Sequence, residues 1–286
     1  KELRRCRVEL RQDRVTEVAV SGGRVSGVKL EKAGLVNCEA VLLATGGASY
    51  PRTGSTGDGY RIAEALGHTI TPIRGSLVPL ESEDRACSQL QGLSLRNVVL
   101  RMKNQRGKTV YQEQGELLFT HFGLSGPLVL SASAHMDFAR DRYAAHIDLK
   151  PALDEEKLDA RLLRDFGERA NQDVSNALGA LVPRSMIPVM AERTGIDGQT
   201  KVRDIRREQR RRLLDALKDF TVDISGPRPV EEAIVTAGGV STAEVDPQTM
   251  QSRLVKGLYF AGELLDIDAD TGGYNLQIAY STGHLA

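Results

Sequence analysis

The sequence has few cysteines, and they form no pattern that points to a metal or redox centre. The three cysteines among its 286 residues are Cys6, Cys38 and Cys87, and no Cys-x-x-Cys pair occurs. The five histidines are scattered as well, so neither a zinc site nor a redox dithiol is indicated. An odd cysteine count without a disulfide framework is typical of a reducing cytosol, so we expect a cytoplasmic protein.

Net charge and long apolar runs are also lacking. Lys plus Arg (38) equals Asp plus Glu (38), which argues against a nucleic-acid surface. No apolar run approaches the ~20 residues needed to span a bilayer. The expected partner is therefore a small-molecule substrate, with no nucleic acid and no membrane. The sequence carries no signal for an oligomeric state.

What the sequence does have is a series of apolar patterns typical of an α/β protein. Residues 5–31 alternate apolar and polar side chains around a Ser-Gly-Gly turn, which predicts a β-meander. Residues 40–44 form a continuous apolar run, the kind of strand that a parallel sheet buries on both faces. A helix is expected over 60–66, with Asp58 as its N-cap.

The middle of the chain, residues 76–235, has a different character. Its apolar spacing predicts antiparallel strands mixed with helices rather than alternating strand and helix. The expected strands are 93–102, 110–119 and 143–149, and the expected helices include 128–135, 154–169 and 208–219.

Three predicted strands run directly into glycines, and a fourth glycine pair precedes a predicted helix. The strand junctions are Ala-Thr-Gly-Gly at 44–47, Thr-Ala-Gly-Gly at 236–239 and Phe-Ala-Gly-Glu at 260–263; the helix follows Gly272 and Gly273. Glycine lets the backbone approach a flat or anionic group, and the positive end of a helix attracts negative charge. We predict a cofactor held largely by main chain, although tight turns without a ligand would leave the same pattern.

The junctions flank the middle segment, which defines the expected architecture. We predict a partial, Rossmann-like α/β domain formed by residues 1–75 and 236–286. A β-rich domain with helices, an α+β insert over residues 76–235, interrupts it. Ligands of open α/β sheets gather at the carboxyl ends of the strands, so the cofactor is expected at the junctions.

The junction motifs resemble the FAD domain of two-dinucleotide-binding flavoproteins. They are most similar to the BaiN (YhiN-like) family of NAD(P)/FAD-dependent oxidoreductases. The likeness covers nearly all 286 positions and rests on the motifs at 44–51, 53–60, 115–127, 236–240 and 256–279.

One departure from that family is large. The family begins with a strand, a Gly-x-Gly-x-x-Gly turn and a helix that hold the FAD pyrophosphate, and no part of this sequence matches them. Gly57-Asp58-Gly59 lacks the third glycine and does not follow a strand directly. We expect a family member without that N-terminal segment. The sequence is compatible with an FAD site that is occupied and with one that is empty.

The resemblance implies a flavin-dependent oxidoreductase that transfers hydride between NAD(P)H, FAD and a small organic substrate. The inserted domain would cover the flavin and select the substrate. The cofactor-binding residues that the resemblance implies are Thr45, Gly46, Gly47, Gly238, Gly239, Gly262, Glu263, Gly272, Gly273, Tyr274 and Asn275.

Individual side chains in these motifs have both a functional and a plain interpretation. Glu263 would accept hydrogen bonds from the ribityl hydroxyls of the flavin, or it is a surface acid. The helix start at 272–275 would face the flavin pyrimidine edge and favour the reduced flavin, or it is a capped loop. His121 is the one histidine inside a family motif, so it is a candidate proton donor or acceptor, or a structural histidine.

Two other functions are compatible with the sequence. Residues 56–63 are similar to a segment of fumarate-reductase-like flavoproteins, which would need a cluster of Arg and His to clamp a dicarboxylate. No such cluster is identifiable. A non-catalytic binding module, or a fragment without bound flavin, is the alternative from a different class.

Overall fold

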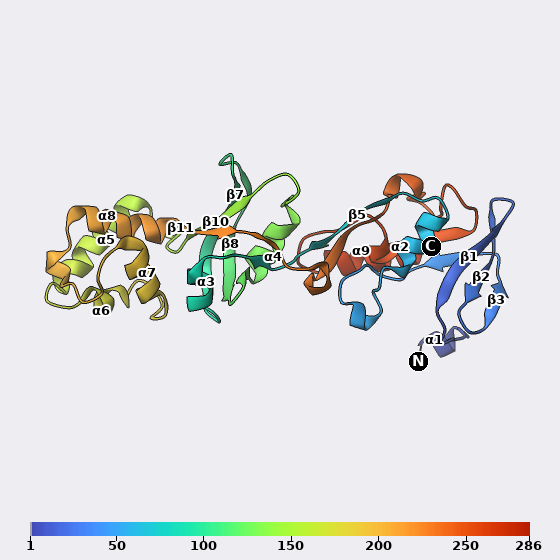
Figure 1. Cartoon of the computed structure of the whole chain (residues 1–286), viewed down its shortest axis with the longest axis horizontal. Helices are drawn as coiled ribbons and strands as arrows, with labels where there is room; N and C mark the ends of the chain where they lie inside the picture. Colours follow the sequence, from blue (N-terminus) through green and yellow to red (C-terminus); the bar gives the residue numbers. More distant parts are fainter. Residues whose placement is uncertain (1) are drawn as a thin grey trace. The chain divides into compact units, whose positions relative to one another are not determined.

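The computed structural model describes residues 2–286, which fold into two compact units (Figure 1). One unit, which we call the discontinuous unit, contains the chain up to Ser76 together with Ala233–Ala286. The other, the inserted unit, is Leu77–Glu232. These limits lie within three residues of the domain boundaries expected from the sequence, whereas the cofactor and substrate roles assigned to the two domains remain predictions.

The discontinuous unit begins with the expected β-meander, but its first predicted strand is wrong. Residues 6–14 form no strand; they follow a short helix, α1 (Glu2–Arg5). Val8 and Leu10 are exposed, so the alternation there has no layer to pack against. The three antiparallel strands, in the order β1-β2-β3, are β1 (Val15–Ser21), β2 (Arg24–Leu30) and β3 (Gly34–Asn37).

A short parallel pair carries two of the predicted junctions. β4 (Val41–Leu43) lies parallel to β14 (Leu258–Phe260), with Leu43 opposite Phe260. The expected burial on both faces is wrong, because the Leu42 side chain is 45% exposed. Only two strands make up this sheet in the described chain, so β4 also has one edge without a neighbouring strand.

The third junction lies in a different sheet. β13 (Val235–Val240) pairs in antiparallel fashion with β5 (Ile70–Ser76), and all six of its residues are buried. Gly238 and Gly239 fall inside β13, where the register shifts, and not after its end. The prediction of a third strand that ends in a glycine pair beside the other two is therefore wrong.

Two longer helices complete the discontinuous unit. α2 (Asp58–Ala65) follows Gly57, which adopts the left-handed conformation (φ 75°) and is the N-cap. The predicted Asp58 cap is wrong: Asp58 is the first helical residue, and its carboxylate instead accepts two hydrogen bonds from Arg14 (2.9 and 2.7 Å). α9 (Tyr274–Leu285) follows the last glycine pair, as expected.

The inserted unit is built on a seven-stranded antiparallel sheet in the order β11-β10-β7-β8-β9-β6-β12. β7 and β8 form a long hairpin, and the strands predicted over 93–102, 110–119 and 143–149 are confirmed as β7, β8 and β10. The strands are β6 (Leu80–Glu81), β7 (Ser94–Asn104), β8 (Thr109–Thr120), β9 (Gly123–Ser125), β10 (Tyr143–Asp148), β11 (Phe220–Ile224) and β12 (Gly226–Pro227).

Helices cover one face of this sheet and form a cluster at one end of the unit (Figure 1). Leu100 of β7, Phe119 of β8 and Phe220 of β11 are buried with Leu158 and Leu213 in one core. None of the described helices is both long and apolar enough to cross a membrane. The helices are α3 (Arg85–Gln89), α4 (Pro127–Ala134), α5 (Glu155–Glu168), α6 (Val174–Leu178), α7 (Met186–Thr194) and α8 (Arg207–Lys218).

A buried histidine holds together distant parts of the discontinuous unit. His68 Nδ1 lies 3.0 Å from a Glu244 carboxylate oxygen, and Nε2 lies 2.9 Å from Ser252 Oγ. The ring also packs edge-on against Phe260 (centroids 4.8 Å apart). Burial lowers the pKa of His68 below its ordinary value of 6.5, against the opposing effect of Glu244.

The lowered pKa of His68 predicts a loss of stability in mild acid. The unfolded chain binds a proton at His68 more readily than the folded chain, so stability present above about pH 6.5 is lost as the pH falls. The apparent melting temperature should fall between about pH 7.5 and about pH 5.5, and by less in His68→Gln than in the wild type. Equal slopes in the two proteins would contradict the assignment.

Candidate cofactor site

The predicted junctions meet at Glu263. This residue lies on the short 3-10 turn Gly262–Leu264, directly after β14. Its Oε1 accepts a hydrogen bond from the Thr236 N–H (2.5 Å) and one from Ser49 Oγ (3.3 Å). The Tyr60 hydroxyl donates to the Glu263 carbonyl oxygen (3.2 Å). One half-buried carboxylate therefore contacts both of the other junctions.

Thr236 completes the connection. Its Oγ1 accepts from the N–H groups of Ala48 (2.8 Å) and Ser49 (3.1 Å). Gly47 packs against this pair: a Cβ on Gly47 would overlap Thr236 Oγ1 and would lie 2.8 Å from Glu263 Oε1. We call Gly47, Ala48, Ser49, Thr236 and Glu263 the junction cluster.

Part of the junction region stays open to solvent. Glu263 Oε2 has no hydrogen-bond partner among the described residues. Thr45 is exposed, and Gly46 beside it is half-buried with a left-handed backbone (φ 73°). Gly262 also has a positive φ (71°), and its N–H donates to Thr282 Oγ1 of α9 (2.9 Å).

The glycine pair in β13 faces the protein's own backbone. Gly238 and Gly239 are buried, and both have positive φ (85° and 139°). A Cβ on Gly238 would overlap the Pro72 carbonyl oxygen, and one on Gly239 would lie 2.5 Å from the Leu264 carbonyl oxygen. Close strand packing therefore accounts for both glycines without a ligand.

The start of α9 is an uncapped, exposed helix end. Gly273 is the N-cap in the left-handed conformation (φ 90°), and no side chain caps the helix. Gly272, Gly273 and Tyr274 are exposed. Asn275 holds the preceding loop, because Oδ1 accepts from the Ala269 N–H (2.9 Å) and Nδ2 donates to the Ala269 carbonyl (2.7 Å). Its backbone N–H belongs to the first turn, whose amides have no acceptor within the helix.

His121 belongs to the inserted unit and not to the junction cluster. It is exposed on the turn between β8 and β9, with its ring edge-on to Phe122 (5.1 Å between centroids). No hydrogen bond joins it to a described residue. Its catalytic role therefore remains a prediction from the motif.

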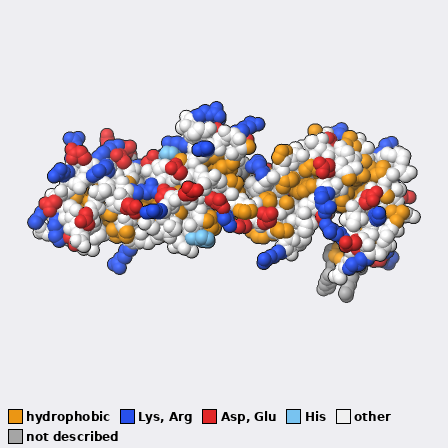
Figure 2. All heavy atoms as spheres, viewed as in Figure 1, with side chains coloured by type: hydrophobic (Ala, Val, Ile, Leu, Met, Phe, Trp, Pro, Cys, Tyr) orange, Lys and Arg blue, Asp and Glu red, His pale blue; other side chains and the backbone are white. Residues whose placement is uncertain are grey.

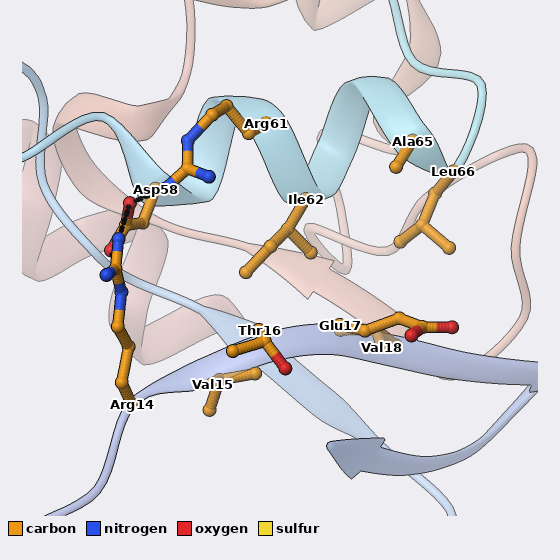
Figure 3. Close-up of a pocket in the computed structure, with 10 residues that line it drawn as sticks. All are labelled: Arg14, Val15, Thr16, Glu17, Val18, Asp58, Arg61, Ile62, Ala65 and Leu66. Carbon is orange, nitrogen blue, oxygen red and sulfur yellow. Dashed lines mark hydrogen bonds and ion pairs between the residues drawn. The ribbon is translucent and has the colours of Figure 1, made fainter. Parts of the chain in front are cut away.

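A hollow elsewhere in the discontinuous unit is lined by none of the predicted cofactor-binding residues. It lies between β1 and α2, with Arg14 and Arg61 at one end and Ile62 and Leu66 along the helix (Figure 3). Both arginines already pair with the Asp58 carboxylate, so neither is left free as an anchor for an anionic ligand. In the part of the chain that the structure describes, no group of His, Cys, Asp or Glu could hold a metal ion.

The sequence interpretation missed Ser49, Tyr60 and Thr236. Thr236 opens the Thr-Ala-Gly-Gly motif, and a small hydroxyl residue beside a glycine pair was the available signal. Nothing in the sequence indicates that its hydroxyl would bind a turn 187 residues away.

Comparison with known proteins places the chain in a family. All 286 residues match the family described as "HI0933-like protein Rossmann domain". The chain belongs to this family. Both the expected family resemblance and the α/β, Rossmann-like fold class are thereby confirmed.

Three curated relatives have more specific names. The chain is 35% identical over 262 residues to "Ribosomal RNA dihydrouridine synthase" of Escherichia coli (90% of this chain, 62% of that protein). It is 29% identical over 290 residues to "3-dehydro-bile acid delta(4,6)-reductase" of Clostridium scindens (98% and 70%). A "Ribosomal RNA dihydrouridine synthase" of Haemophilus influenzae is 33% identical over 249 residues (86% and 59%). The chain thus spans about three-fifths of the length of the two synthases.

The hydroxyl of Thr236 should be required for the junction cluster. Thr236→Val keeps the branched shape but leaves the N–H groups of Ala48, which is half-buried, and Ser49, which is buried, without an acceptor; this should cost about 2 kcal/mol. Thr236→Ser keeps the hydroxyl and should cost about 1 kcal/mol. Hydrogen exchange over residues 44–52, measured by mass spectrometry, should accelerate strongly in the valine variant only. Equal exchange in both variants would show that the hydroxyl does not hold this turn.

Gly47 should tolerate no side chain. Gly47→Ala pushes a methyl group against Thr236 and Glu263 and should destabilise the protein by about 2 kcal/mol. Gly283→Ala is a matched control in α9, where a Cβ meets nothing within 4 Å, and it should be neutral or stabilise by up to about 1 kcal/mol. Urea unfolding compares the two, and similar midpoints would contradict the packing described.

Proposed function

We propose that the chain is part of a flavin-dependent oxidoreductase that uses NAD(P)H to reduce a conjugated carbon–carbon double bond. Family membership and the similarity to a named reductase support the oxidoreductase class. The observation that carries the proposal is the junction cluster. Hydrogen bonds to Oε1 hold the Glu263 carboxylate in place. The second oxygen, Oε2, has no partner among the described residues.

The residues present fit the flavin end of FAD. Glu263 Oε2 would accept hydrogen bonds from ribityl hydroxyls, and the backbone at Thr45 and Gly46 is open enough for close approach. The uncapped start of α9 would stabilise negative charge on the bound group. When bound, FAD supplies the hydride chemistry.

The contributions of the chain itself are binding and orientation. Thr236 holds the 47–49 turn and fixes the Glu263 carboxylate at the same time. Gly238 allows β13 to pack closely against the Pro72 carbonyl of β5, and Gly239 allows close packing against the backbone of Leu264, next to Glu263. Their proposed role is therefore to support the site from behind rather than to contact the cofactor.

The names of the relatives suggest a substrate class. Dihydrouridine differs from uridine by two hydrogens across C5=C6, a double bond conjugated with a carbonyl. A 3-dehydro-bile acid delta(4,6)-reductase is also named for a ketone with double bonds. We propose an α,β-unsaturated carbonyl as substrate, to which the net reaction adds a hydride from NAD(P)H and a proton from solvent.

Two candidates follow for the molecule that carries this carbonyl. The similarity to two ribosomal RNA dihydrouridine synthases favours a uracil base within RNA. The similarity to the bile-acid reductase favours a small enone, which agrees with the small-molecule substrate expected from the sequence.

The test is flavin uptake followed by turnover. Purified protein supplied with FAD should retain flavin absorption bands, and these should bleach anaerobically on addition of NADPH or NADH. Uridine-containing ribosomal RNA and a steroid enone are then offered separately, and mass spectrometry measures the gain of two hydrogens. A colourless protein that takes up no FAD, even when supplied as the full-length protein, would refute the proposal.

Removing the charge of Glu263 should weaken FAD binding. Glu263→Gln keeps an oxygen for the Thr236 N–H but forms weaker hydrogen bonds with hydroxyls, so the Kd for FAD should rise about tenfold or more. Glu31→Gln removes an exposed acid from the same unit and is the control. Flavin fluorescence titration measures both, and an unchanged Kd in Glu263→Gln would exclude the proposed contact.

A further inference from the structure

The inserted unit contains a long stretch without acidic residues. Between Asp84 and Glu113 there are six Lys and Arg residues and no Asp or Glu. The whole chain is neutral, so this excess of positive charge is local. The six residues are Arg85, Arg96, Arg101, Lys103, Arg106 and Lys108.

The β7–β8 hairpin concentrates these charges at its tip. Along β7, Leu100 and Met102 are buried in the core, whereas Arg101 and Lys103 alternate with them on the opposite face. The strand ends at Asn104, and β8 begins at Thr109. Arg106 and Lys108 therefore lie in the connecting turn, and both are exposed.

A further arginine lies beside the turn. The Gln105 N–H donates to the Arg142 carbonyl (3.1 Å), and the Arg142 N–H donates to Gln105 Oε1 (2.8 Å). Lys103 and Arg142 line one hollow together with Gln105 and His146. We call Lys103, Arg106, Lys108 and Arg142 the hairpin patch. Figure 2 shows Lys and Arg side chains at the projecting end of this hairpin.

Most of the charge in the hairpin patch is not neutralised. Only Arg106 has an acidic partner, Asp141 (3.0 Å). The side chains of the other three members have no hydrogen-bond or ion-pair partner among the described residues. Asp223 lines the same hollow, and Asp219 binds His146, which also lines it.

The acids and cations around this region otherwise compensate one another. Asp141 also accepts hydrogen bonds from Asn104 (3.4 Å) and Gln105 (2.8 Å). Arg140 pairs with Asp137 (3.2 Å). On α8, by contrast, Arg210 and Arg211 both pair with carboxylates of α5. Lys103, Lys108 and Arg142 are thus three cations without acidic partners among the described residues that lie at one end of the β7–β8 hairpin.

We propose that the hairpin patch binds the phosphate backbone of RNA. The proposal rests on the proposed function, in its form with a uracil base in RNA as substrate. Lys and Arg side chains supply most of the affinity for a polyphosphate chain. The side chains of Asn104 and Gln105 already bind Asp141 and the backbone of the turn, so the proposed contacts are with phosphates and come from the cations. The exposed turn 105–108 carries no apolar side chain that would insert into a lipid surface.

Direct binding tests this proposal without any flavin. The probe is a short, fluorescein-labelled, uridine-rich single-stranded RNA, and its anisotropy is measured over a series of salt concentrations. The variant Lys103→Ala/Lys108→Ala/Arg142→Ala should bind at least about tenfold more weakly than the wild type. Its slope of log K against log salt should be about 2 smaller, since each lost phosphate contact contributes about 0.7.

A matched control removes the same charge elsewhere in the inserted unit. Arg184, Arg207 and Arg212 are exposed and lack acidic partners among the described residues, so Arg184→Ala/Arg207→Ala/Arg212→Ala should bind RNA like the wild type. The charge-conserving variant Lys103→Arg/Lys108→Arg/Arg142→Lys should restore binding. Circular dichroism confirms that each variant is folded.

Three results would overturn the proposal. They are wild-type affinity in the hairpin variant, an equal loss in the control variant, and equal affinity for anionic vesicles with the same dependence on the hairpin patch. Failure to take up FAD would refute the proposed function while leaving this binding result intact. Flavin reduction without RNA binding would refute the RNA-binding proposal and leave the proposed function intact.

Discussion

The structure of the discontinuous unit depends on the two hydrogen-bonding groups of Thr236. Its N–H binds the Glu263 carboxylate and its hydroxyl binds the turn at Ala48 and Ser49, so a single buried residue joins all three junctions. The entire inserted unit lies in sequence between Ser49 and Thr236. The chain leaves and returns along paired strands, since Ser76 of β5 lies opposite Val235 of β13. The contacts that close the discontinuous unit around its insertion are therefore the same contacts that form the site.

The sequence predicted those elements whose pattern depends only on their own core. The β7–β8 hairpin and α5 follow because alternating or helically spaced apolar residues face one buried layer. For the strand at residues 235–240, the sequence did not indicate the antiparallel pairing with β5. All six residues are buried, and a fully buried strand has the same continuous apolar pattern in either orientation. The strand predicted over residues 6–10 does not form, because no layer of the protein covers its apolar side chains.

The glycines show why the site could be located only in part. Glycine permits close approach by any group, and the sequence does not say whether a ligand or the protein's own backbone approaches. Gly47, Gly238 and Gly239 are explained by Thr236, Pro72 and Leu264, which all belong to the chain. A Cβ on the exposed Gly273 would meet nothing within 4 Å, whereas one on the half-buried Gly46 would lie 3.0 Å from Ser55 Oγ, a side-chain atom and not backbone. The glycine motifs thus locate the region of the candidate cofactor site. Burial in the structure then separates glycines that pack against the protein itself from glycines that are free to contact a cofactor.

Net charge, like a glycine motif, is ambiguous evidence when only the sequence is known. A net charge of zero excludes a uniformly basic protein, yet it does not determine where the charges lie. Salt would separate the two proposed functions, because ions screen exposed charges far more than buried contacts. The junction cluster is held by backbone amides and a half-buried carboxylate, whereas the hairpin patch consists of exposed and half-exposed cations. A protein that combines them should keep its cofactor site at salt concentrations that release a polyanionic substrate.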